Sequence, residues 1–312
     1  MRVVRYSSEW AAAWDRHVDA ARNGHFFFKR GYMEYHSDRF ADHSLLFLDD
    51  RDRILAALPA NESADRVLWS HQGLTFGGLL LSQKVRAGEV LDAFARLRDY
   101  LRAHGLPRLR YKAIPSIYHA LPSQEDRYAL FRNDAICDRV DLSIAIDLSG
   151  PWRPNPGKRG GARKAGKLGV EVEASRDFDA FFSMATARLA ERYDALSVHS
   201  AAEMALLSER FPEQITLHLA QHEGEVLAGV LLFRTSTVWH TQYMSSTEKG
   251  RRMRALDLVV VELLEAAQGV VRFFDFGISN EDAGRILNET LCRQKEEFGG
   301  SGVVHEFFTL EP

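Results

Sequence analysis

Apolar and polar positions follow one another in the same order in the two halves of the chain. Each half contains two short apolar runs separated by a polar turn, which is the pattern of a β-hairpin. The runs cover residues 44–48 and 54–58 in the first half, and residues 215–220 and 226–233 in the second. The pattern therefore predicts one antiparallel hairpin in each half.

An amphipathic helix pattern follows each hairpin. Residues 91–101 and residues 256–264 both begin with Leu-Asp and repeat apolar residues at helical spacing. Each pattern ends near a glycine, Gly105 or Gly269, and a strand pattern comes next. These strand patterns cover residues 108–114 and 271–278. The shared order predicts an internal duplication. The alternative is coincidence, because any chain that mixes helices and strands can show this order.

Further helices and a last strand complete the predicted elements. The helices cover residues 9–21, 178–193, 201–210 and 282–298, and the strand covers residues 303–308. Together with the two hairpins, these elements predict a mixed fold, α/β or α+β in class.

A proline-rich segment marks a boundary near the middle of the chain. Three of the nine prolines lie within six residues, from 151 to 156, and prolines interrupt regular elements. The 312 residues suffice for two domains of roughly 100–200 residues each. We therefore expect domains at residues 1–150 and 151–312. The next stretch, residues 158–167, has five cations and no acid, so it should face solvent or an anion.

The overall charge and the cysteines exclude several classes of protein. Forty Lys and Arg against 43 Asp and Glu give a net charge of -3, which excludes a nucleic-acid binder that relies on bulk positive charge. Cys137 and Cys292 lie far apart with no His at ligand spacing, so we expect free thiols and no bound metal. The N-terminal residues do not read as a secretory signal, and no apolar run approaches the ~20 residues of a membrane span, so we expect a cytoplasmic protein.

Several segments resemble the GNAT superfamily of N-acyltransferases, and within it the FemAB-like members found with bacterial polysaccharide biosynthesis genes. The segments are residues 70–79, 143–148, 240–243, 274–279 and 287–299. The resemblance implies two tandem GNAT-like domains, each a mixed, mostly antiparallel sheet flanked by helices, with the active site in the cleft between them. It also implies transfer of an acyl or aminoacyl group to an amine, with the donor held in the second domain.

The resemblance places the pyrophosphate of acyl-CoA at a helix start in the second domain. GNAT domains hold this group on backbone amides in a Q/R-x-x-G-x-G/A loop. Here the loop keeps the final small residue, Ala255, but has Met253 at the position of the central glycine. Cations gather at this helix start, where they oppose the helix dipole unless an anion lies among them. We expect phosphate contacts, from CoA, a nucleotide-sugar or tRNA, and the alternative is a solvated charged loop. The expected donor-binding residues are Lys249, Gly250, Arg251, Arg252, Arg254, Ala255 and Asn288.

His240 is the first candidate for the general base. Alternation along its strand pattern puts His240, Gln242 and Met244 on one face, and it puts Tyr243 on the opposite face. An imidazole that titrates near neutral pH suits proton removal from an amine. Gln242 and Tyr243 are expected to contact the substrate. The alternative for His240 is a buried side chain that is hydrogen-bonded to its neighbours.

Three further residues are expected at the catalytic site. Asp275 interrupts an aromatic run on a central strand, where a carboxylate needs a fixed partner or a function. Lys295 matches a Lys-x-x-Phe segment that the FemAB resemblance associates with the site; we expect it to stabilise the oxyanion, and a surface lysine is the alternative. Glu281 is a second candidate base, or a cap for the helix predicted to start near it.

Substrate contacts are also expected from the first domain and from the basic stretch. Residues 70–78 are rich in glycine but lack cations. This composition fits a domain that has lost donor binding and lines the acceptor groove, with His71 and Lys112 toward the cleft. Arg159 and Arg163 are expected to hold an acceptor phosphate, and a solvated helix face is the alternative.

The resulting hypothesis is an N-acyltransferase. An amine of an amino-sugar or nucleotide-sugar attacks the thioester of an acyl-CoA, with acetyl-CoA as the expected donor and no metal. The enzyme alternative takes aminoacyl-tRNA as donor, as peptidoglycan-bridge members of the family do, and the Met253 departure favours it. The non-enzyme alternative is a GNAT scaffold that binds a glycan or a nucleotide without catalysis.

Overall fold

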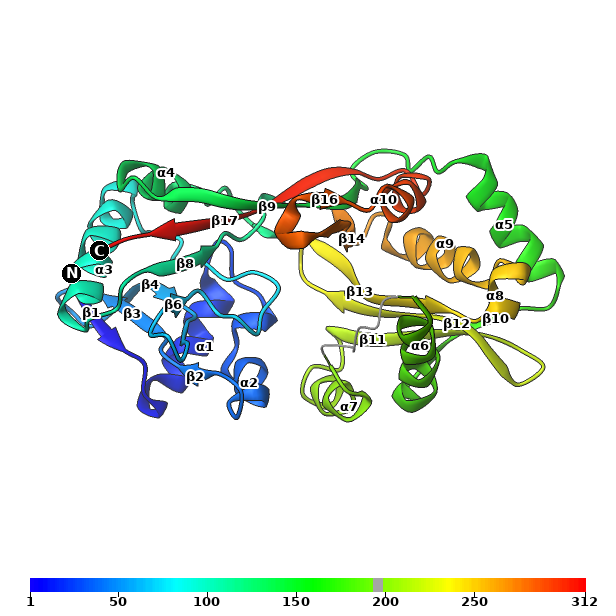
Figure 1. The fold of residues 1–312 in the computed structure, drawn as a ribbon, viewed down its shortest axis with the longest axis horizontal. Coiled ribbons are helices and arrows are strands. Elements are labelled where there is room, and N and C mark those ends of the chain that lie inside the picture. The colour runs from blue at the N-terminus through cyan, green and yellow to red at the C-terminus, as the bar shows by residue number, and fades with distance from the viewer. Residues whose placement is uncertain (193–198) are drawn as a thin grey trace. The chain divides into compact units, whose positions relative to one another are not determined.

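The computed structural model describes residues 1–192 and 199–312, and the chain divides into two compact units (Figure 1). The first unit comprises Met1–Asp141, Asp282–Ile286 and Val304–Pro312, and the second comprises Leu142–Glu281 and Leu287–Val303. Two strands, β9 (Ile136–Asp147) and β17 (Ser301–Leu310), contribute residues to both units. The division therefore differs from the predicted boundary after residue 150, because it falls within β9 and returns the C-terminal segment to the first unit.

The first unit is built on two sets of paired strands. Its short strands are β1 (Arg2–Arg5), β2 (Ala41–Asp42), β3 (Leu45–Leu48), β4 (Ile54–Leu58), β5 (Asn61–Glu62), β6 (Leu68–Trp69), β7 (Leu80–Leu81) and β8 (Leu109–Lys112). One set has the order β1-β3-β4-β7. The other set has the order β17-β8-β6-β5-β2. Leu45 pairs with Leu58 across β3 and β4, which confirms the hairpin predicted in the first half.

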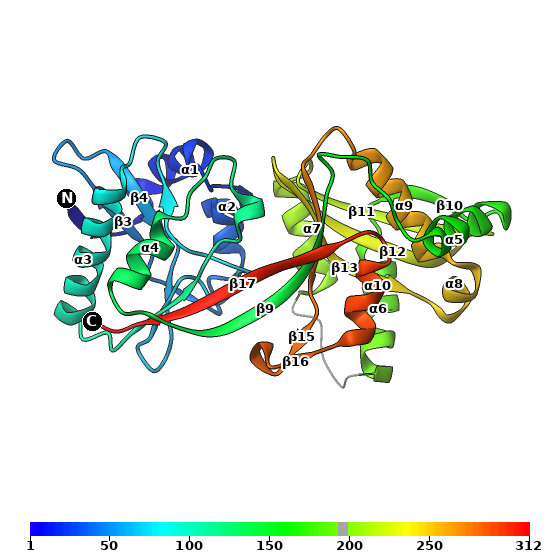
Figure 2. The same cartoon turned by 90° about the horizontal axis from the view of Figure 1, so that it is seen from above.

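Helices cover the core of the first unit. They are α1 (Ala11–Ala20), α2 (Arg30–Met33), α3 (Ala87–Ala103) and α4 (Glu125–Arg132). α3 buries Val90, Phe94 and Leu97, which recur at three- and four-residue intervals and so form one apolar face. α4 lies beside α3 (Figure 2) and packs into the same core. The helix predicted from residue 91 is confirmed, but it begins earlier, at Ala87.

The second unit is a mixed, mostly antiparallel sheet. Its strands, besides β9, include β10 (Glu171–Ser175), β11 (Ile215–His222), β12 (Glu225–Arg234), β13 (Val238–Ser246) and β14 (Phe273–Ile278). The order is β10-β11-β12-β13-β14-β9, and each of these pairs is antiparallel except that of β13 with β14, which is parallel. Ile215 pairs with Phe233, which confirms the second predicted hairpin.

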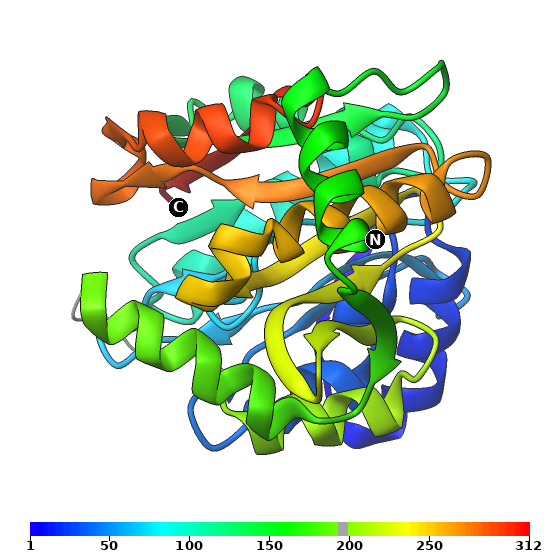
Figure 3. The same ribbon diagram turned by 90° about the vertical axis from the view of Figure 1, so that its right-hand side faces the viewer.

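Helices lie on both faces of this sheet (Figure 3). They are α5 (Pro156–Lys167), α6 (Phe178–Arg192), α7 (Ala201–Arg210), α8 (Glu248–Met253), α9 (Ala255–Ala267) and α10 (Glu289–Glu296). α5, α9 and α10 share one core with the sheet, for example through Ala165, Val259 and Leu232. α6 covers the other face, where the ring of Phe181 packs over Gly229. The predicted end of α6 at Tyr193 lies outside the described residues.

The two units repeat one topology. In the first, β6 and β8 are parallel neighbours joined through α3, with Leu68 opposite Leu109. In the second, β13 and β14 are parallel neighbours joined through α9, with Val238 opposite Phe273. Each arrangement follows an antiparallel hairpin in the chain. The repeated strand, helix and parallel strand support the predicted duplication.

The helix predicted over residues 282–298 is wrong at its N-terminal end. A short hairpin, β15 (Asn280–Glu281) with β16 (Ile286–Leu287), precedes α10, which begins only at Glu289. Asp282 and Ala283 adopt left-handed backbone conformations with φ of 48° each, which a helix does not accommodate. The chain reverses at these residues, and the predicted capping of a helix there by Glu281 does not occur.

Residues 1–192 and 199–312 were expected to contain neither a membrane-spanning helix nor a metal site. None of the helices in these ranges is long and apolar enough to cross a membrane. The same ranges contain no group of three or more His, Cys, Asp or Glu side chains placed to hold a metal ion. Cys137 is exposed and Cys292 is buried, and both are free thiols.

Candidate functional site

The second unit holds a cavity of about 820 Å³ at the point where two parallel strands separate. The pairing of β13 with β14 ends at His240 and Asp275. Past that point, residues 243–246 of β13 and residues 279–281 after β14 form opposite parts of the cavity wall. The rest of the wall includes Lys158, Ala185, Gly250, Arg251, Arg254, Leu256, Asp257, Asn288, Thr290, Leu291 and Gln294. All of these residues belong to the second unit.

A β-bulge in β13 changes which side chains share a face. The register with β12 shifts between Leu231 and Leu232, and this shift leaves Gln242 as an extra residue in the strand. Because the extra residue reverses the alternation, Tyr243 shares the face of His240. The predicted alternation is therefore wrong beyond the bulge.

The bulge gives Tyr243 and Gln242 different surroundings. Tyr243 lies on the cavity wall, its ring centroid is 5.6 Å from that of Phe182, and its hydroxyl is 2.7 Å from Nδ1 of His199. Gln242 does not line the cavity, and its buried side-chain oxygen has no hydrogen-bond partner within the part of the chain that the structure describes. Tyr243 is thus the better placed of the two predicted substrate contacts.

His240 and Asp275 form a buried pair at the base of the separating strands. Nδ1 of His240 lies 2.9 Å from Oδ2 of Asp275, whose side chain is fully buried. Oδ1 of Asp275 accepts hydrogen bonds from the Ser143 hydroxyl and from the backbone N–H of Gly277. A carboxylate only accepts, so the imidazole donates from Nδ1 and its basic nitrogen is Nε2. His240 itself is 6% exposed and does not line the cavity.

Lys295 binds the chain where it leaves β14. Its ammonium donates to the carbonyl oxygens of Gly277 and Ile278, at 2.8 and 2.7 Å, and to the Ser279 hydroxyl at 3.0 Å. Burial lowers the pKa of Lys295 to about 8, partly opposed by the nearby charge of Asp275. Three acceptors occupy the three donors of an ammonium, so Lys295 ties α10 to this turn.

Glu281 and Asn288 are joined on the cavity wall. Nδ2 of Asn288 donates to Oε1 of Glu281 at 2.9 Å, and its Oδ1 caps α10 by accepting from the backbone N–H of Leu291 at 3.0 Å. Glu281 is exposed, unlike Asp275 and Lys295. The structure thus places an accessible carboxylate at the cavity, held in position by a helix cap.

The predicted phosphate loop is folded into helix α8. The Thr247 hydroxyl caps α8 by accepting from the backbone N–H of Gly250 at 2.9 Å. A Cβ on Gly250 would lie 2.1 Å from the carbonyl oxygen of Leu227, so glycine is required for this close approach to β12. Arg254 then adopts a left-handed conformation with φ of 65°, and α9 begins at Ala255, which is buried in the core.

The predicted donor-binding cations divide into two pairs. Lys249 and Arg252 lie away from the cavity and form exposed ion pairs with Glu225 and Glu248, at 2.5 and 2.7 Å. Arg251 and Arg254 lie on the cavity wall with Gly250. Among the described wall residues, the cations are therefore Arg251, Arg254 and Lys158, and the sequence analysis predicted the first two.

Two wall residues that the sequence prediction missed, Asp257 and Lys158, form ion pairs at the cavity. Asp257, in the first turn of α9, lies 2.5 Å from Arg254 and 3.6 Å from Nζ of Lys158. Lys158 is buried and also lies 3.1 Å from Glu297. Burial raises the pKa of Asp257, and the two cations oppose this shift. Asp257 belongs to the Leu-Asp pair that marked the helix start, and Lys158 begins the basic stretch, but neither pattern indicated that they meet.

The predicted contacts from the first half are buried inside the first unit. The Lys112 ammonium donates to the carbonyl oxygens of His71, at 3.1 Å, and Leu74. Burial lowers the pKa of Lys112 to about 7 and lowers the pKa of His71 well below its ordinary value. His71 has a positive φ of 65° and stacks on His36 with ring centroids 5.1 Å apart. Both side chains thus hold the glycine-rich turn.

Arg159 and Arg163 lie on the exposed face of α5 and do not line the cavity. The Arg159 guanidinium lies over the Trp152 ring, 5.4 Å from its centroid. Lys158, Gly161, Ala162 and Ala165 are the buried residues of this helix. The basic stretch is therefore an amphipathic helix whose cationic face is largely solvated.

One stretch of the chain matches a known family. Residues 157–283, which carry α5 and the strands and helices through β14, match the family described as "Acetyltransferase (GNAT) domain". No curated protein sequence matches the chain significantly.

Several solved structures share the fold over nearly the whole chain. FemX has 11% sequence identity and a TM-score of 0.71, covering 100% of this chain and 98% of its own. The C-terminal domain of a putative lysylphosphatidylglycerol synthetase from Agrobacterium fabrum has 12% identity and a TM-score of 0.62, covering 96% and 91%. A tandem GNAT protein from the clavulanic acid biosynthesis pathway has 13% identity and a TM-score of 0.53, covering 99% and 98%. At these identities the likeness is one of fold.

Proposed function

We propose a donor, an acceptor and a general base for this chain, which is an N-acyltransferase built of two tandem GNAT-like domains. The family match over residues 157–283 and the fold shared with a tandem GNAT protein confirm the resemblance predicted from the sequence. The proposed reaction takes place at the cavity of the second unit, which lies in the region of the family match.

The proposed donor is acyl-CoA, with acetyl-CoA as the simplest case. The observation that carries this proposal is the position of the cavity, between the separated ends of β13 and β14 and beside the first turn of α9. An extended chain can hydrogen-bond to the edge of β13 past the end of its pairing with β14, as an added strand does. Arg251 and Arg254 on the wall offer charge-assisted hydrogen bonds to a diphosphate near the helix N-terminus.

Glu281 is the proposed general base. It is the exposed carboxylate on the cavity wall, whereas His240 is buried and does not line the cavity. Glu281 removes a proton from the acceptor ammonium, and the amine nitrogen attacks the thioester carbon. Glu281 releases this first proton to solvent. The tetrahedral adduct collapses to an amide as the C–S bond breaks, and the second proton leaves the nitrogen and passes to the CoA thiolate.

The proposed acceptor is an amino-sugar or a nucleotide-sugar used in polysaccharide biosynthesis. The Gln294 amide on the wall suits the hydroxyl groups of a sugar ring. The Glu281 carboxylate suits its ammonium group. Tyr243 adds an aromatic surface with a hydroxyl, which the sequence prediction assigned to the substrate.

Calorimetric titration with acetyl-CoA tests the donor. We expect the wild-type chain to bind acetyl-CoA, and Arg251→Gln to weaken binding about 10-fold, since one charge-assisted hydrogen bond is lost. Arg252→Gln is the matched control, because Arg252 is the neighbouring cation but is paired with Glu248 outside the cavity. Equal affinities in the wild type and both variants would rule out a phosphate contact by Arg251.

The second candidate donor is an aminoacyl-tRNA. Asp257 favours it, because this carboxylate lies in the first turn of α9, next to Arg254, where it opposes a diphosphate. Helix α8 also favours this donor, because it takes the place of the glycine loop on which GNAT domains hold a diphosphate. A rise in melting temperature with charged tRNA but not with acetyl-CoA would select this donor over acyl-CoA.

A further inference from the structure

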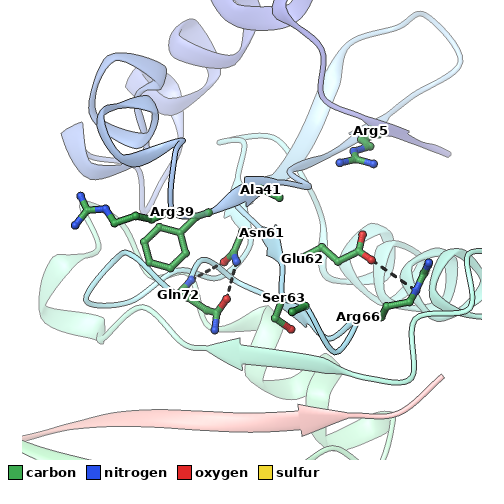
Figure 4. A pocket seen from close by; sticks show the side chains of 10 residues that line it. Arg5, Arg39, Ala41, Asn61, Glu62, Ser63, Arg66 and Gln72 are labelled. Atoms are coloured by element: carbon green, nitrogen blue, oxygen red, sulfur yellow. Dashed lines mark hydrogen bonds and ion pairs between the residues drawn. The ribbon is translucent and has the colours of Figure 1, made fainter.

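The first unit has a groove of about 620 Å³ that the proposed reaction does not use (Figure 4). It runs along β2 and β5, which pair through Ala41 and Glu62. Its wall includes three arginines, Arg5, Arg39 and Arg66, with Glu62 as the one carboxylate among its described lining residues. All of its lining residues belong to the first unit.

The floor of the groove presents a fixed amide. Oδ1 of the buried Asn61 accepts from the backbone N–H of Gln72 at 2.7 Å, and its Nδ2 donates to Oε1 of Gln72 at 2.7 Å (Figure 4). A backbone N–H can only donate, so this pair of bonds determines the orientation of both amides. The side-chain oxygen of Gln72 is therefore engaged, and its NH₂ group is the part that can donate to a ligand.

Two of the arginines, Arg5 and Arg66, donate to backbone carbonyls, which do not neutralise them. Arg5 donates to the carbonyl oxygen of Asp42 at 2.6 Å, and Arg66 donates to the carbonyl oxygen of His104 at 2.6 Å. The carboxylate of Asp42 is paired with Arg30 instead. A carbonyl positions a guanidinium but leaves its charge uncompensated.

The one carboxylate among the described lining residues offsets part of this charge. Oε2 of Glu62 lies 2.8 Å from Nδ1 of the buried His43, and Oε1 lies 3.6 Å from Arg66. Burial and the charge of Arg5 both lower the pKa of His43, and the hydrogen bond with Glu62 opposes this shift. Asp38, which lies 3.9 Å from Arg39, is 79% exposed, and solvent screens that pair. The groove is therefore locally positive in a chain of net charge -3.

The loop that carries Arg66 is held by its own hydrogen bonds. The backbone N–H of Ser63 donates to the carbonyl oxygen of Val67 at 3.0 Å, and the N–H of Val67 donates to the Ser63 hydroxyl at 3.2 Å. Arg66 has a positive φ of 62° within this turn, an uncommon conformation for a residue with a side chain. A held turn reduces the entropy lost when a ligand binds.

We propose that this groove binds an anionic sugar, a hydroxyl-bearing ring that carries a phosphate or a carboxylate group. Arg5 and Arg66 bind the anionic group, and the NH₂ group of Gln72 donates to a ring hydroxyl. The volume of the groove suits a ligand of one or two rings. The inference does not rest on the proposed reaction, because the groove and the acyl-transfer cavity belong to different units.

Isothermal titration calorimetry of the full chain with glucose 6-phosphate, glucuronate, glucose and inorganic phosphate tests the proposal. We expect at least one of the two anionic sugars to bind 10-fold or more tightly than glucose and than inorganic phosphate. The tighter of the two identifies the anionic group as phosphate or carboxylate. Absence of binding by both anionic sugars, or equal affinity for glucose, would overturn the proposal, and equal affinity for inorganic phosphate would overturn the role of the ring.

Variants locate the site. We expect Arg5→Gln combined with Arg66→Gln to weaken binding of the anionic sugar at least 10-fold. Arg102→Gln is the matched control, since Arg102 is an exposed arginine of the same unit that is paired with Asp99. Arg5→Gln alone is measured as well, because both arginines also hold a backbone carbonyl and the double variant could misfold, which circular dichroism would reveal. Unchanged affinity in both the single and the double variant would exclude this groove as the site.

Discussion

The ionisable side chains around the end of β14 differ in their burial and in the groups to which they hydrogen-bond. Asp275 and Lys295 are buried, and their bonds go to protein groups, chiefly the turn after the strand. Removing one partner of a buried charge is strongly destabilising because it leaves the other group uncompensated. Glu281 is exposed on the cavity wall and is held by the Asn288 amide. Substitution of Asp275 or Lys295 should therefore mainly lower the stability of the fold. Substitution of Glu281 should mainly lower the rate of turnover.

Glu281→Gln should lower kcat about 100-fold, the contribution typical of a general base. The melting temperature and the affinity for acetyl-CoA should stay close to those of the wild type, because glutamine can still accept the Asn288 hydrogen bond. Glu289→Gln is the matched control, an exposed glutamate at the start of α10 that does not line the cavity. Steady-state kinetics and thermal denaturation of the purified variants provide both measurements.

The opposite result would reassign the base. If a folded His240→Gln variant loses turnover while Glu281→Gln keeps it, the imidazole acts on the amine, and Asp275 orients it through the bond to Nδ1. If Lys295→Met keeps its melting temperature but loses kcat, Lys295 stabilises the oxyanion instead of tying α10 to the turn.

Helix α5 shows how one element can shape a site through its smallest residues. Its buried positions, Lys158, Gly161, Ala162 and Ala165, recur at helical spacing and form one face. A Cβ on Gly161 would lie 2.2 Å from Oδ2 of Asp257 and 2.7 Å from Nε of Arg254. The glycine therefore leaves room for the ion pair at the start of α9. A Cβ on the neighbouring Gly160 would meet no atom within 4 Å from other elements in the described part of the chain.

Gly161→Ala should weaken acetyl-CoA binding about 10-fold, because a displaced Arg254 loses a charge-assisted hydrogen bond to the donor. The atoms it meets are the ends of side chains, so the protein should still fold. Gly160→Ala is the matched control and should stabilise α5 by about 0.5–1 kcal/mol without affecting donor affinity. Calorimetric titration and thermal denaturation separate the two effects, and equal donor affinity in both variants would contradict a role of Arg254 in binding.

At the scale of the whole molecule, the C-terminal strand belongs mainly to the unit that begins the chain. Residues 304–312 are part of the first unit. There, Phe307 pairs with Lys112 of β8, and Leu310 is fully buried in the core shared with α3. The last residues of the chain are therefore required to complete the first unit, although they follow the whole of the second in sequence.

Deletion of residues 304–312 should destabilise the first unit selectively. Backbone amides of β8 and α3 should exchange with solvent faster, because β8 loses one of its two hydrogen-bonded neighbours and the core loses Leu310. Amides of β11 and β12 should keep their protection. Hydrogen exchange measured by mass spectrometry distinguishes the segments. Faster exchange in β11 and β12 with β8 unaffected would instead favour contiguous domains that meet after residue 150.

The sequence by itself determined the elements that depend on neighbouring residues. Both hairpins, α3, α9 and the final strand follow from local periodicity, because side chains that repeat at strand or helix spacing form a face that must be buried. The order of these elements and the segment resemblance also predicted the tandem GNAT-like fold. They identified Arg251, Arg254, Glu281, Asn288 and Tyr243, which line the cavity.

Only the tertiary structure decided which chemistry-bearing residues meet. The bulge at Gln242 depends on the register with β12, and it moves Tyr243 to the face of His240. The contact of Lys158 with Asp257 depends on the packing of α5 on α9. The return of β17 to the first unit likewise depends on residues far away in sequence. A local pattern specifies which face of an element is buried, but long-range pairing selects its partner, and that partner decides which side chains share the cavity.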